Sequence, residues 1–468
     1  MELNLAELAD RLGGRLLGSD GSVGGLAVDG LAIDSRLVRP GQLFAALVAE
    51  RDGHDFVAGA LGAGATAALV ERETGPDGPW TGPVVVVPSV PEALAELARI
   101  ARAELERPGE PARVVGVTGS VGKTTTKDLM ANVLGTTYAT VASEKSFNNE
   151  LGVPLTLLNA PAGTEAAVIE MGARGIGHIR HLCELARPTV GVVTVVRGVH
   201  TEVMGTVEQI AVAKRELVEH LGADGVAVLN ADDPNVAAMA AHTVAPVLTF
   251  GPGGEVHAID VEVDDELRAR FTLRSPWGSS PVRLGVRGEH NVTNALAAAA
   301  VGLWLGVPVE RVATGLAEAP ASPWRMELVR VPDGPTVLND AYNAGPASMA
   351  AALQALAALP VGPTGRRFAV LGVMAELGPE GPDEHRRIAE LAAELDVTVL
   401  AVGCDLYGVP DVVDGAADVV AALDVLADRD ASAGRSAGGV GADDVVLVKG
   451  SRVAGLERAA EALTRPGR

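Results

Sequence analysis

A strand, a glycine-rich turn and a helix follow one another near residue 115, and this order most constrains how the chain can fold. Residues 114–117 are an apolar run, and GSVGKT follows at residues 119–124, directly before a helical pattern. The backbone N–H groups of such a turn and the helix N-terminus converge on phosphate oxygens. A glycine-rich turn alone is more often structural, but Gly-Lys-Thr at a strand-to-helix junction favours nucleotide phosphate, with lysine on the outer phosphates and threonine on magnesium. The match is not strict, because the first glycine of the nucleotide motif is replaced by valine at position 117 and Gly116 precedes it.

Composition excludes several classes of partner. The 468 residues carry a net charge of -22, so the long-range field repels nucleic acid and anionic membranes. The longest apolar run, residues 295–309, is shorter than the roughly 20 residues that a membrane span needs, and the N-terminus does not have the pattern of a secretory signal. Two cysteines far apart in sequence, Cys183 and Cys404, fit a reducing compartment. We expect a cytoplasmic protein that does not insert into membranes, and we expect a monomer.

Lysine is scarce in this chain. Of 38 basic residues only five are lysine, namely Lys123, Lys127, Lys145, Lys214 and Lys449. Lysine differs from arginine as a compact point charge and as an amine that can lose its proton and react. The lysines are therefore candidates for roles that arginine cannot fill, although codon bias alone is an adequate explanation for Lys127 and Lys145.

Alternating apolar runs and helical patterns predict α/β layers in three domains, at residues 1–87, 88–319 and 320–468. A breaker stretch at residues 107–111 precedes the phosphate turn, and a small, proline-rich stretch at residues 317–323 precedes the third domain. Besides residues 114–117, strands are predicted at residues 167–169, 190–196, 226–229, 368–371, 397–402 and 445–448.

Motifs spread along the whole chain resemble those of the Mur ligase family. TGSVGKT at residues 118–124 is the form of phosphate loop that this family uses. Further matches are NNELGVP at 148–154, EMGA at 170–173, AKRE at 213–216, GEHNVTN at 288–294, DAYN at 340–343 and KGSR at 449–452. The resemblance implies a central, parallel-sheet, P-loop ATPase-like domain, flanked by a small N-terminal α/β domain that binds the UDP end of the substrate and a Rossmann-like C-terminal domain.

Fewer residues indicate which reaction of the family to expect. NNE at residues 148–150 stands where members that add the third amino acid carry Thr-Thr-Pro. The Asp-Asn-Pro-Arg signature of those members is also absent from this chain. LGVMAELG at residues 371–378 resembles the corresponding motif of members that add D-alanyl-D-alanine, although Val373 replaces its aspartate and Gly345 replaces an asparagine of a second motif. The resemblance thus implies an ATP-dependent, ADP-forming ligase that joins D-alanyl-D-alanine to UDP-N-acetylmuramoyl-tripeptide through an acyl phosphate. A third-residue-adding ligase and a nucleotide-binding protein without ligase activity stay open as alternatives.

The resemblance also assigns roles to single residues. The implied ATP-binding residues are Thr118, Gly119, Ser120, Val121, Gly122, Lys123, Thr124, Asn294, Arg325 and Asp340. Magnesium is assigned to Thr124, Glu170, His200 and Lys214, with Lys214 carbamylated, and the UDP-linked substrate to Ser35, Arg36, Asn148 and Asn149. Lys123, Lys214, His200 and Arg325 are the expected catalytic residues, and Lys449 would close over the nucleotide with Arg325.

Structural alternatives accompany several of these assignments. Glu170 and His200 follow successive apolar runs, which places them at the ends of predicted strands. Open α/β sheets hold ligands at strand ends, but a single residue in such a position is usually structural. Ser35 and Arg36 suit a diphosphate or form an ordinary turn. Asn294 contacts adenine or caps a helix. His385 is as compatible with a structural as with a functional role.

Overall fold

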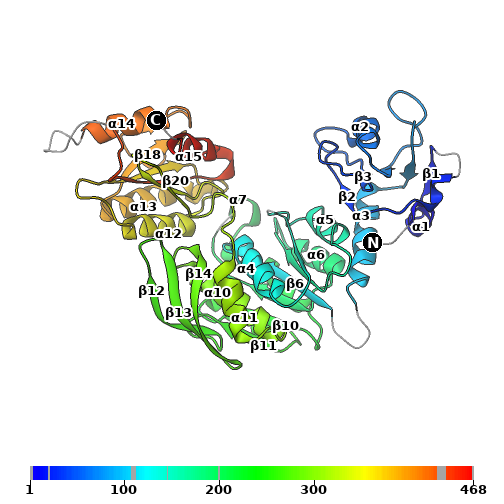
Figure 1. Cartoon of the computed structure of the whole chain (residues 1–468), viewed down its shortest axis with the longest axis horizontal. Helices are drawn as coiled ribbons and strands as arrows, with labels where there is room; N and C mark the ends of the chain where they lie inside the picture. The colour runs from blue at the N-terminus through cyan, green and yellow to red at the C-terminus, as the bar shows by residue number, and fades with distance from the viewer. Residues whose placement is uncertain are drawn as a thin grey trace.

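The chain is described by a computed structural model that covers residues 4–18, 22–106, 112–144, 146–198, 201–429 and 439–465. Four sheets follow one another along the sequence. The N-terminal and C-terminal parts lie on opposite sides of the central part in the view of Figure 1. Within the described residues no helix combines the length and the apolar character needed to cross a membrane.

The N-terminal part is a small α/β unit. Its sheet has the order β1-β5-β4-β3-β2, in which only β1 runs antiparallel to its neighbour. The strands are β1 (Arg15–Leu17), β2 (Leu31–Ala32), β3 (Leu43–Ala45), β4 (Ala67–Val70) and β5 (Val84–Val86), and the helices are α1 (Leu5–Arg11) and α2 (Val57–Gly62).

The next helix, α3 (Val90–Ala103), leaves this unit. Ser89 caps its first turn and Pro91 lies within that turn, both of which are favoured at a helix start. Its buried face packs against α5 (Gly152–Leu158) and α6 (His178–Ala186) of the central part.

A six-stranded, fully parallel sheet forms the centre of the molecule, in the order β11-β10-β9-β6-β8-β7. Its strands are β6 (Arg113–Thr118), β7 (Thr140–Ala142), β8 (Ala166–Glu170), β9 (Val190–Val193), β10 (Val226–Asn230) and β11 (Val247–Phe250). Helices that cover it include α4 (Lys123–Gly135), α8 (Val207–Glu219), α9 (Pro234–Ala237), α10 (Asn291–Trp304) and α11 (Val309–Glu318). Because helices cover both faces, these strands read as continuous apolar runs, which is why the sequence predicted them.

The prediction for β9 was too long. Residues 190–196 were expected to be a strand, but β9 ends at Val193. From there the chain leaves the sheet and braces the phosphate loop, because Val195 O accepts a hydrogen bond from Ser120 N at 2.8 Å.

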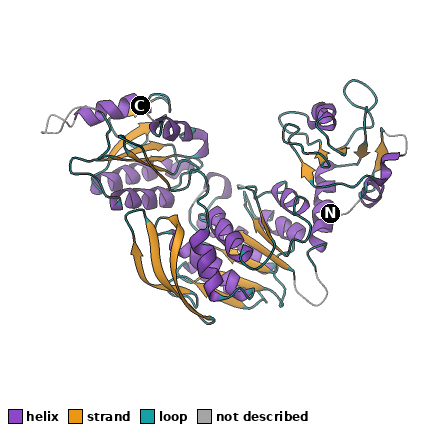
Figure 2. Cartoon of the chain, viewed as in Figure 1, coloured by secondary structure: helices purple, strands orange, loops and turns teal. Residues whose placement is uncertain are grey.

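A separate three-stranded antiparallel sheet follows, which the sequence analysis did not predict. It consists of β12 (His257–Val263), β13 (Arg268–Ser275) and β14 (Gly278–Arg287) and is drawn as three long neighbouring strands in Figure 2. Its buried face joins the central core through Phe271, Leu273 and Leu284.

The C-terminal part is a second α/β layer structure. Its sheet has the order β15-β16-β20-β17-β18-β19 and is parallel except for β15. The strands are β15 (Glu327–Arg330), β16 (Thr336–Asn339), β17 (Arg367–Gly372), β18 (Thr398–Val402), β19 (Val412–Val413) and β20 (Val445–Lys449). Helices α12 (Pro346–Ala358) and α13 (Gly381–Glu394) pack in one core, and α14 (Val419–Arg429) and α15 (Glu457–Leu463) pack in the other.

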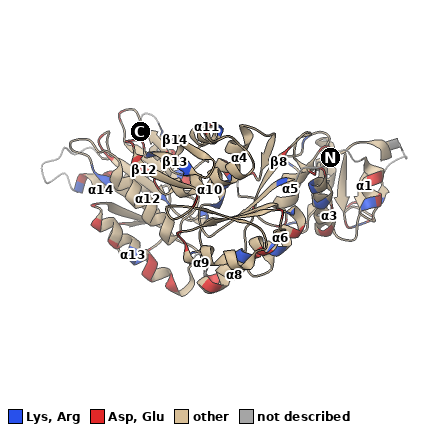
Figure 3. Cartoon of the chain, turned by 90° about the horizontal axis from the view of Figure 1, so that it is seen from below, with Lys and Arg blue, Asp and Glu red and all other residues tan. Residues whose placement is uncertain are grey.

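The predicted α/β architecture is therefore confirmed, whereas the residue bounds of the three domains stay a prediction. Acidic side chains are conspicuous along α8 and α13 when the molecule is viewed from below (Figure 3).

Candidate active site

The phosphate loop lies in a cleft of about 1080 Å³ between the central and C-terminal parts. The cleft wall contains residues from both parts, among them the phosphate loop and the start of α10 on one side and Arg325, Asp340 and Lys449 on the other. Segments that are more than 300 residues apart in sequence therefore share one cavity.

Glycine is required at two positions of the loop. Gly119 and Gly122 have φ values of 153° and 85°, and residues other than glycine rarely adopt such backbone conformations. A Cβ on Gly119 would lie 1.9 Å from Thr194 Oγ1, and one on Gly122 would lie 2.5 Å from Asn294 Oδ1. These close contacts hold the loop against its neighbours, so its shape is set by the surrounding fold.

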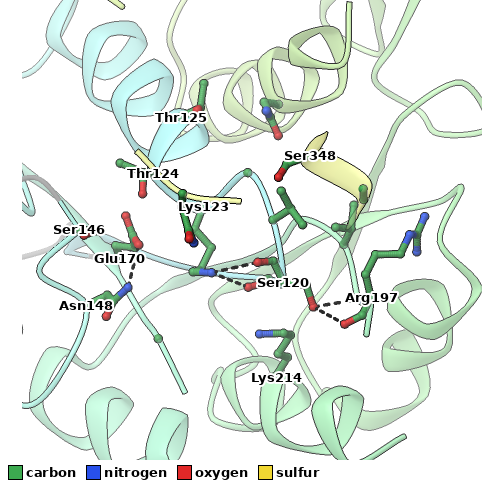
Figure 4. Close-up of a pocket in the computed structure, with 18 of the residues that line it drawn as sticks. Ser120, Lys123, Thr124, Thr125, Ser146, Asn148, Glu170, Arg197, Lys214 and Ser348 are labelled. Carbon is green, nitrogen blue, oxygen red and sulfur yellow. Dashed lines mark hydrogen bonds between the residues drawn. The ribbon is translucent and has the colours of Figure 1, made fainter. Parts of the chain in front are cut away.

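Lys123 lies back over the loop. Its Nζ donates to Gly119 O at 2.8 Å and to Ser120 O at 3.3 Å (Figure 4). Burial lowers the pKa of Lys123, the charge of Glu170 opposes this effect, and that of Arg325 adds to it. The helix that follows, α4, begins without a side-chain cap, so its first N–H groups are available to an anion.

Glu170, at the end of β8, meets one requirement of a magnesium ligand. Its Oε1 accepts a hydrogen bond from Asn148 Nδ2 at 2.9 Å, and its Oε2 is buried without a hydrogen-bond partner in the described part of the chain. A buried carboxylate oxygen without a partner is costly unless something binds it, and magnesium prefers oxygen ligands. The residues present thus fit the ion, although the described ranges contain no group of three or more His, Cys, Asp and Glu that could hold a metal.

Lys214 is a largely buried cation that lines the cleft. A capping box formed by Thr206 and Gln209 starts α8, and this helix buries Lys214 to 4% exposure. No hydrogen bond or ion pair links its amine to the described residues, and Figure 4 draws none. Burial, and to a lesser degree the charge of Lys123, hold the pKa of Lys214 well below its usual value. Arg215, one residue on, instead pairs with Glu219 at 2.7 Å.

The scarce lysines gather at this cleft. Lys123, Lys214 and Lys449 line it, whereas Lys127 is buried in α4 and donates to Ser143 O at 2.6 Å. Lys145 lies outside the described residues. The hypothesis that lysine marks special roles agrees with the three positions in the cleft, whereas the hydrogen bond of Lys127 is a structural role that the sequence analysis did not give it.

The C-terminal side of the cleft presents a connected set of charges. Lys449, at the end of β20, forms an ion pair with Asp340 and donates to Asn343 O at 2.9 Å. The Arg325 guanidinium lies 4.1 Å from the centre of the Tyr342 ring. Asp340 therefore holds Lys449, while Arg325 stacks on Tyr342 and its guanidinium has no ion pair among the described residues, so it can meet a phosphate.

Two side-chain contacts join the two walls. The hydroxyl of Tyr342 hydrogen-bonds that of Ser146, and Ser322 donates to Asp128 in α4. Ser146 and Tyr342 also line the cleft. The sequence analysis gave neither residue a role, because a hydroxyl that acts across domains leaves no pattern along the chain.

The three asparagines with predicted binding roles, Asn148, Asn149 and Asn294, make different contacts in the structure. Asn148 and Asn149 both line the cleft, but Asn149 Oδ1 accepts a hydrogen bond from Gly152 N at the start of α5, at 3.1 Å. Asn294 lies inside the first turn of α10, where it accepts from Thr126 and donates to Asn291, so the interpretation as a helix cap is wrong. Its adenine contact stays a prediction.

Ser35, Arg36 and His385 do not line the cleft, and the place of His200 stays open. Ser35 and Arg36 lie in a turn of the N-terminal part, where the Arg36 hydrogen bonds hold the pKa of Asp34 at about 2. His200 lies outside the described residues. His385 is structural, because its buried ring accepts from Met374 N at 2.9 Å and lies 2.6 Å from Gly381 O.

Glu216 is a further residue that the sequence analysis left without a role. It lies on α8 two residues beyond Lys214, is buried, and accepts hydrogen bonds from Gly177 N at 2.5 Å and Arg180 N at 3.0 Å. Its carboxylate thus caps the N-terminus of α6, which fixes α8 against α6 and positions the helix that carries Lys214.

The fold and the cleft define a nucleotide-dependent ligase of the Mur type, and the chain belongs to the Mur ligase family. Three family models match it: Mur ligase family, catalytic domain, at residues 27–102; Mur ligase middle domain, at 117–302; and Mur ligase, glutamate ligase domain, at 324–452.

Relatives match along the whole chain. The UDP-N-acetylmuramoyl-tripeptide–D-alanyl-D-alanine ligase of Mycobacterium tuberculosis is 42% identical, over 99% of this chain and 98% of the relative. The Escherichia coli protein of the same name is 34% identical, over 100% and 99% of the two chains. Among solved structures, MurF from Acinetobacter baumannii superposes with a TM-score of 0.85 at 30% identity, covering 99% of each chain. MurF from Thermotoga maritima in complex with ADP has a TM-score of 0.77 at 30% identity, covering 93% and 97%.

Proposed function

We propose that this chain is the ATP-dependent ligase that joins D-alanyl-D-alanine to UDP-N-acetylmuramoyl-tripeptide, with release of ADP and phosphate. The observation that carries the proposal is the shared cleft, in which Lys123 on the phosphate loop and Arg325 on the opposite wall face the same space. The full-length similarity to relatives that bear this name supports the choice of substrates.

The cleft is suited to activating a carboxylate. An oxygen of the tripeptide's terminal carboxylate attacks the γ-phosphorus of ATP, the bond to the bridging oxygen breaks, and ADP leaves. The amine of D-alanyl-D-alanine then attacks the acyl phosphate, loses a proton, and expels phosphate as the amide forms. Because two anions meet in the first step, the positive charges of Lys123 and Arg325 stabilise its transition state.

We assign magnesium to the side of the loop next to Glu170. Thr124 and the Glu170 Oε2 atom would hold the ion, with His200 and a carbamylated Lys214 as the family resemblance implies. When bound, magnesium supplies further positive charge where the phosphate oxygens gather. The carbamate forms when the neutral Lys214 amine attacks carbon dioxide and releases one proton. Burial favours the neutral amine that this reaction requires.

The remaining assignments concern the substrate and the movement of the domains. Ser35 and Arg36 would hold the diphosphate of the UDP group, and Asn148 and Asn149 would face the muramoyl peptide. Closure of the C-terminal domain would bring Arg325 and Lys449 over the ATP, whose adenine and ribose meet Asn294 and Asp340, and would exclude water from the acyl phosphate. We place the reaction in the cytoplasm, with the chain acting as a monomer.

A coupled assay of ADP release tests the proposal. The full chain is given ATP, magnesium and UDP-N-acetylmuramoyl-tripeptide with lysine or diaminopimelate as third residue, with and without D-alanyl-D-alanine. We expect turnover only when both the tripeptide and D-alanyl-D-alanine are present. Turnover with UDP-N-acetylmuramoyl-dipeptide and a single amino acid would instead identify a third-residue-adding ligase, and nucleotide binding without turnover on any substrate would identify a non-catalytic protein.

A further inference from the structure

A second cavity, of about 320 Å³, lies on the antiparallel sheet near the chain segment that leads to the C-terminal part. Three arginines line it, namely Arg268 on β13 and Arg283 and Arg287 on β14. The opposite wall is the end of α11 and the start of the connecting segment, at Ala317, Ala319, Pro320 and Ala321. A Cβ on Gly285 would lie 2.5 Å from Ala319 O, so the glycine lets the two walls approach closely.

Arg268 and Arg287 are direct cross-strand partners. Like charges in this position destabilise a sheet unless something compensates them. The Nε atoms of both residues are buried and have no hydrogen-bond partner among the described residues. The Arg268 side chain has a single ion-pair contact, to Glu266 at 3.8 Å, while the Arg287 side chain forms neither a hydrogen bond nor an ion pair with the described part of the chain.

The carboxylates nearby are already engaged. Asp264 pairs with Arg283 at 2.9 Å and lies 3.8 Å from Arg270, and Glu266 pairs with Arg330 of β15 at 3.0 Å. Asp264 and Glu266 thus contact four arginines between them, and Arg287 contacts neither, in a chain whose net charge is -22. This local excess of positive charge favours an anion.

We propose that this cavity binds a phosphate-type oxyanion. The guanidinium groups of Arg268 and Arg287 carry N–H donors in a planar fork that matches the oxygens of such an anion, and the buried Nε–H groups would gain the partners that the protein does not supply. The second cavity contains no residue of the phosphate loop: Gly285 and Arg287 of β14 line it, their neighbour Val286 lines the active-site cleft, and Ala321 borders both cavities.

Calorimetric titration with inorganic phosphate tests this site, using full-length chains that carry Lys123→Ala to weaken binding at the phosphate loop. We expect the Lys123→Ala chain to bind phosphate and the addition of Arg287→Gln to weaken that binding by about tenfold or more, because a charged donor is lost. Arg274→Gln is the matched control, since Arg274 is an exposed arginine of β13 outside the cavity and its replacement should leave the affinity unchanged. Arg268→Gln serves as a second test in case Arg287→Gln does not fold.

The outcomes are distinct. Absence of phosphate binding in the Lys123→Ala chain would overturn the proposal, as would equal affinities in the Arg287→Gln and Arg274→Gln chains. Sulfate should compete with phosphate at matched ionic strength, whereas acetate should compete more weakly. Competition by acetate that equals that of sulfate would refute the assignment to a phosphate-type anion. None of these results depends on ligase activity, so the site can fail or stand independently of the proposed function.

Discussion

Replacing Lys214 with methionine should stabilise the folded chain and strongly lower its activity. The amine of Lys214 is buried in the cleft and makes no hydrogen bond or ion pair with the described residues. Methionine has a similar length and flexibility but no polar group to desolvate. The substitution therefore separates what the amine costs the fold from what it contributes to the reaction.

The size of the effect follows from the missing partner. A buried polar group without a hydrogen bond costs about 1–3 kcal/mol, so Lys214→Met should raise the free energy of unfolding by about that amount. The same substitution should lower kcat by roughly 100-fold to 1000-fold, the range observed when one preorganised electrostatic group is removed from an active site. Urea unfolding should be measured without magnesium and bicarbonate, so that no carbamate forms.

The stability difference should also depend on pH. Burial, and then Lys123, lower the pKa of Lys214 in the folded chain below its usual value of 10.5. Over the interval between the lowered pKa and 10.5 the unfolded chain binds more protons, so the stability of the Lys214 protein rises with pH. Lys214→Met lacks this titration, and its advantage should shrink as the pH approaches 10.5.

Three measurements would refute this reasoning. A Lys214→Met protein that is less stable than its parent would show that the amine has a favourable partner. With ¹³C-labelled bicarbonate, a carbamate resonance should appear for the parent and not for Lys214→Met. Lys214→Ala should be nearly inactive and partly rescued by acetate, whereas Lys214→Arg should not be rescued; substantial activity of Lys214→Arg would show that an ordinary cation suffices.

Three further substitutions probe the site and its support. Lys123→Ala should abolish ligation, since Lys123 is the only basic residue of the loop at residues 118–124, and near-normal ADP release would disprove the loop assignment. Arg325→Ala should lower kcat far more than it weakens binding of the UDP-linked substrate, and steady-state kinetics that show a pure binding defect would count against its role in the transition state. Glu216→Gln should lower the free energy of unfolding by about 1–3 kcal/mol in urea titrations, because the charge that caps α6 through Gly177 and Arg180 is lost; an unchanged midpoint would contradict this.

Local sequence patterns were sufficient to predict those elements whose structure depends mainly on residues that are neighbours in the chain. The phosphate loop could be predicted because a strand, glycines with positive φ and a helix start must be consecutive in the chain. The parallel strands could be predicted because they are buried on both faces and therefore uniformly apolar. The antiparallel sheet of β12, β13 and β14 was missed because the predicted strands were continuous apolar runs, whereas β13 and β14 alternate buried apolar with polar or charged residues, a pattern that also indicates strands.

Residues far apart in sequence were harder to assign. Arg325, Asp340 and Lys449 could be connected with the phosphate loop only by family resemblance, and Ser35 and Arg36 remain in a separate unit in this structure. The distance along the chain between Lys123 and Lys449 contains no information about their distance in space. That relation depends on how the domains pack.

The sequence by itself determined the α/β class, the phosphate loop and the special status of lysine, because each depends on neighbouring residues or on composition. Only the tertiary structure decided that the amine of Lys214 is buried without a partner in the described chain, that Glu216 caps α6, and that Arg268 and Arg287 oppose each other across two strands. The burial of a side chain and its hydrogen-bond or ion-pair partners depend on tertiary packing. A charge is stabilised or left uncompensated by the groups that pack around it, and those groups come from distant parts of the chain.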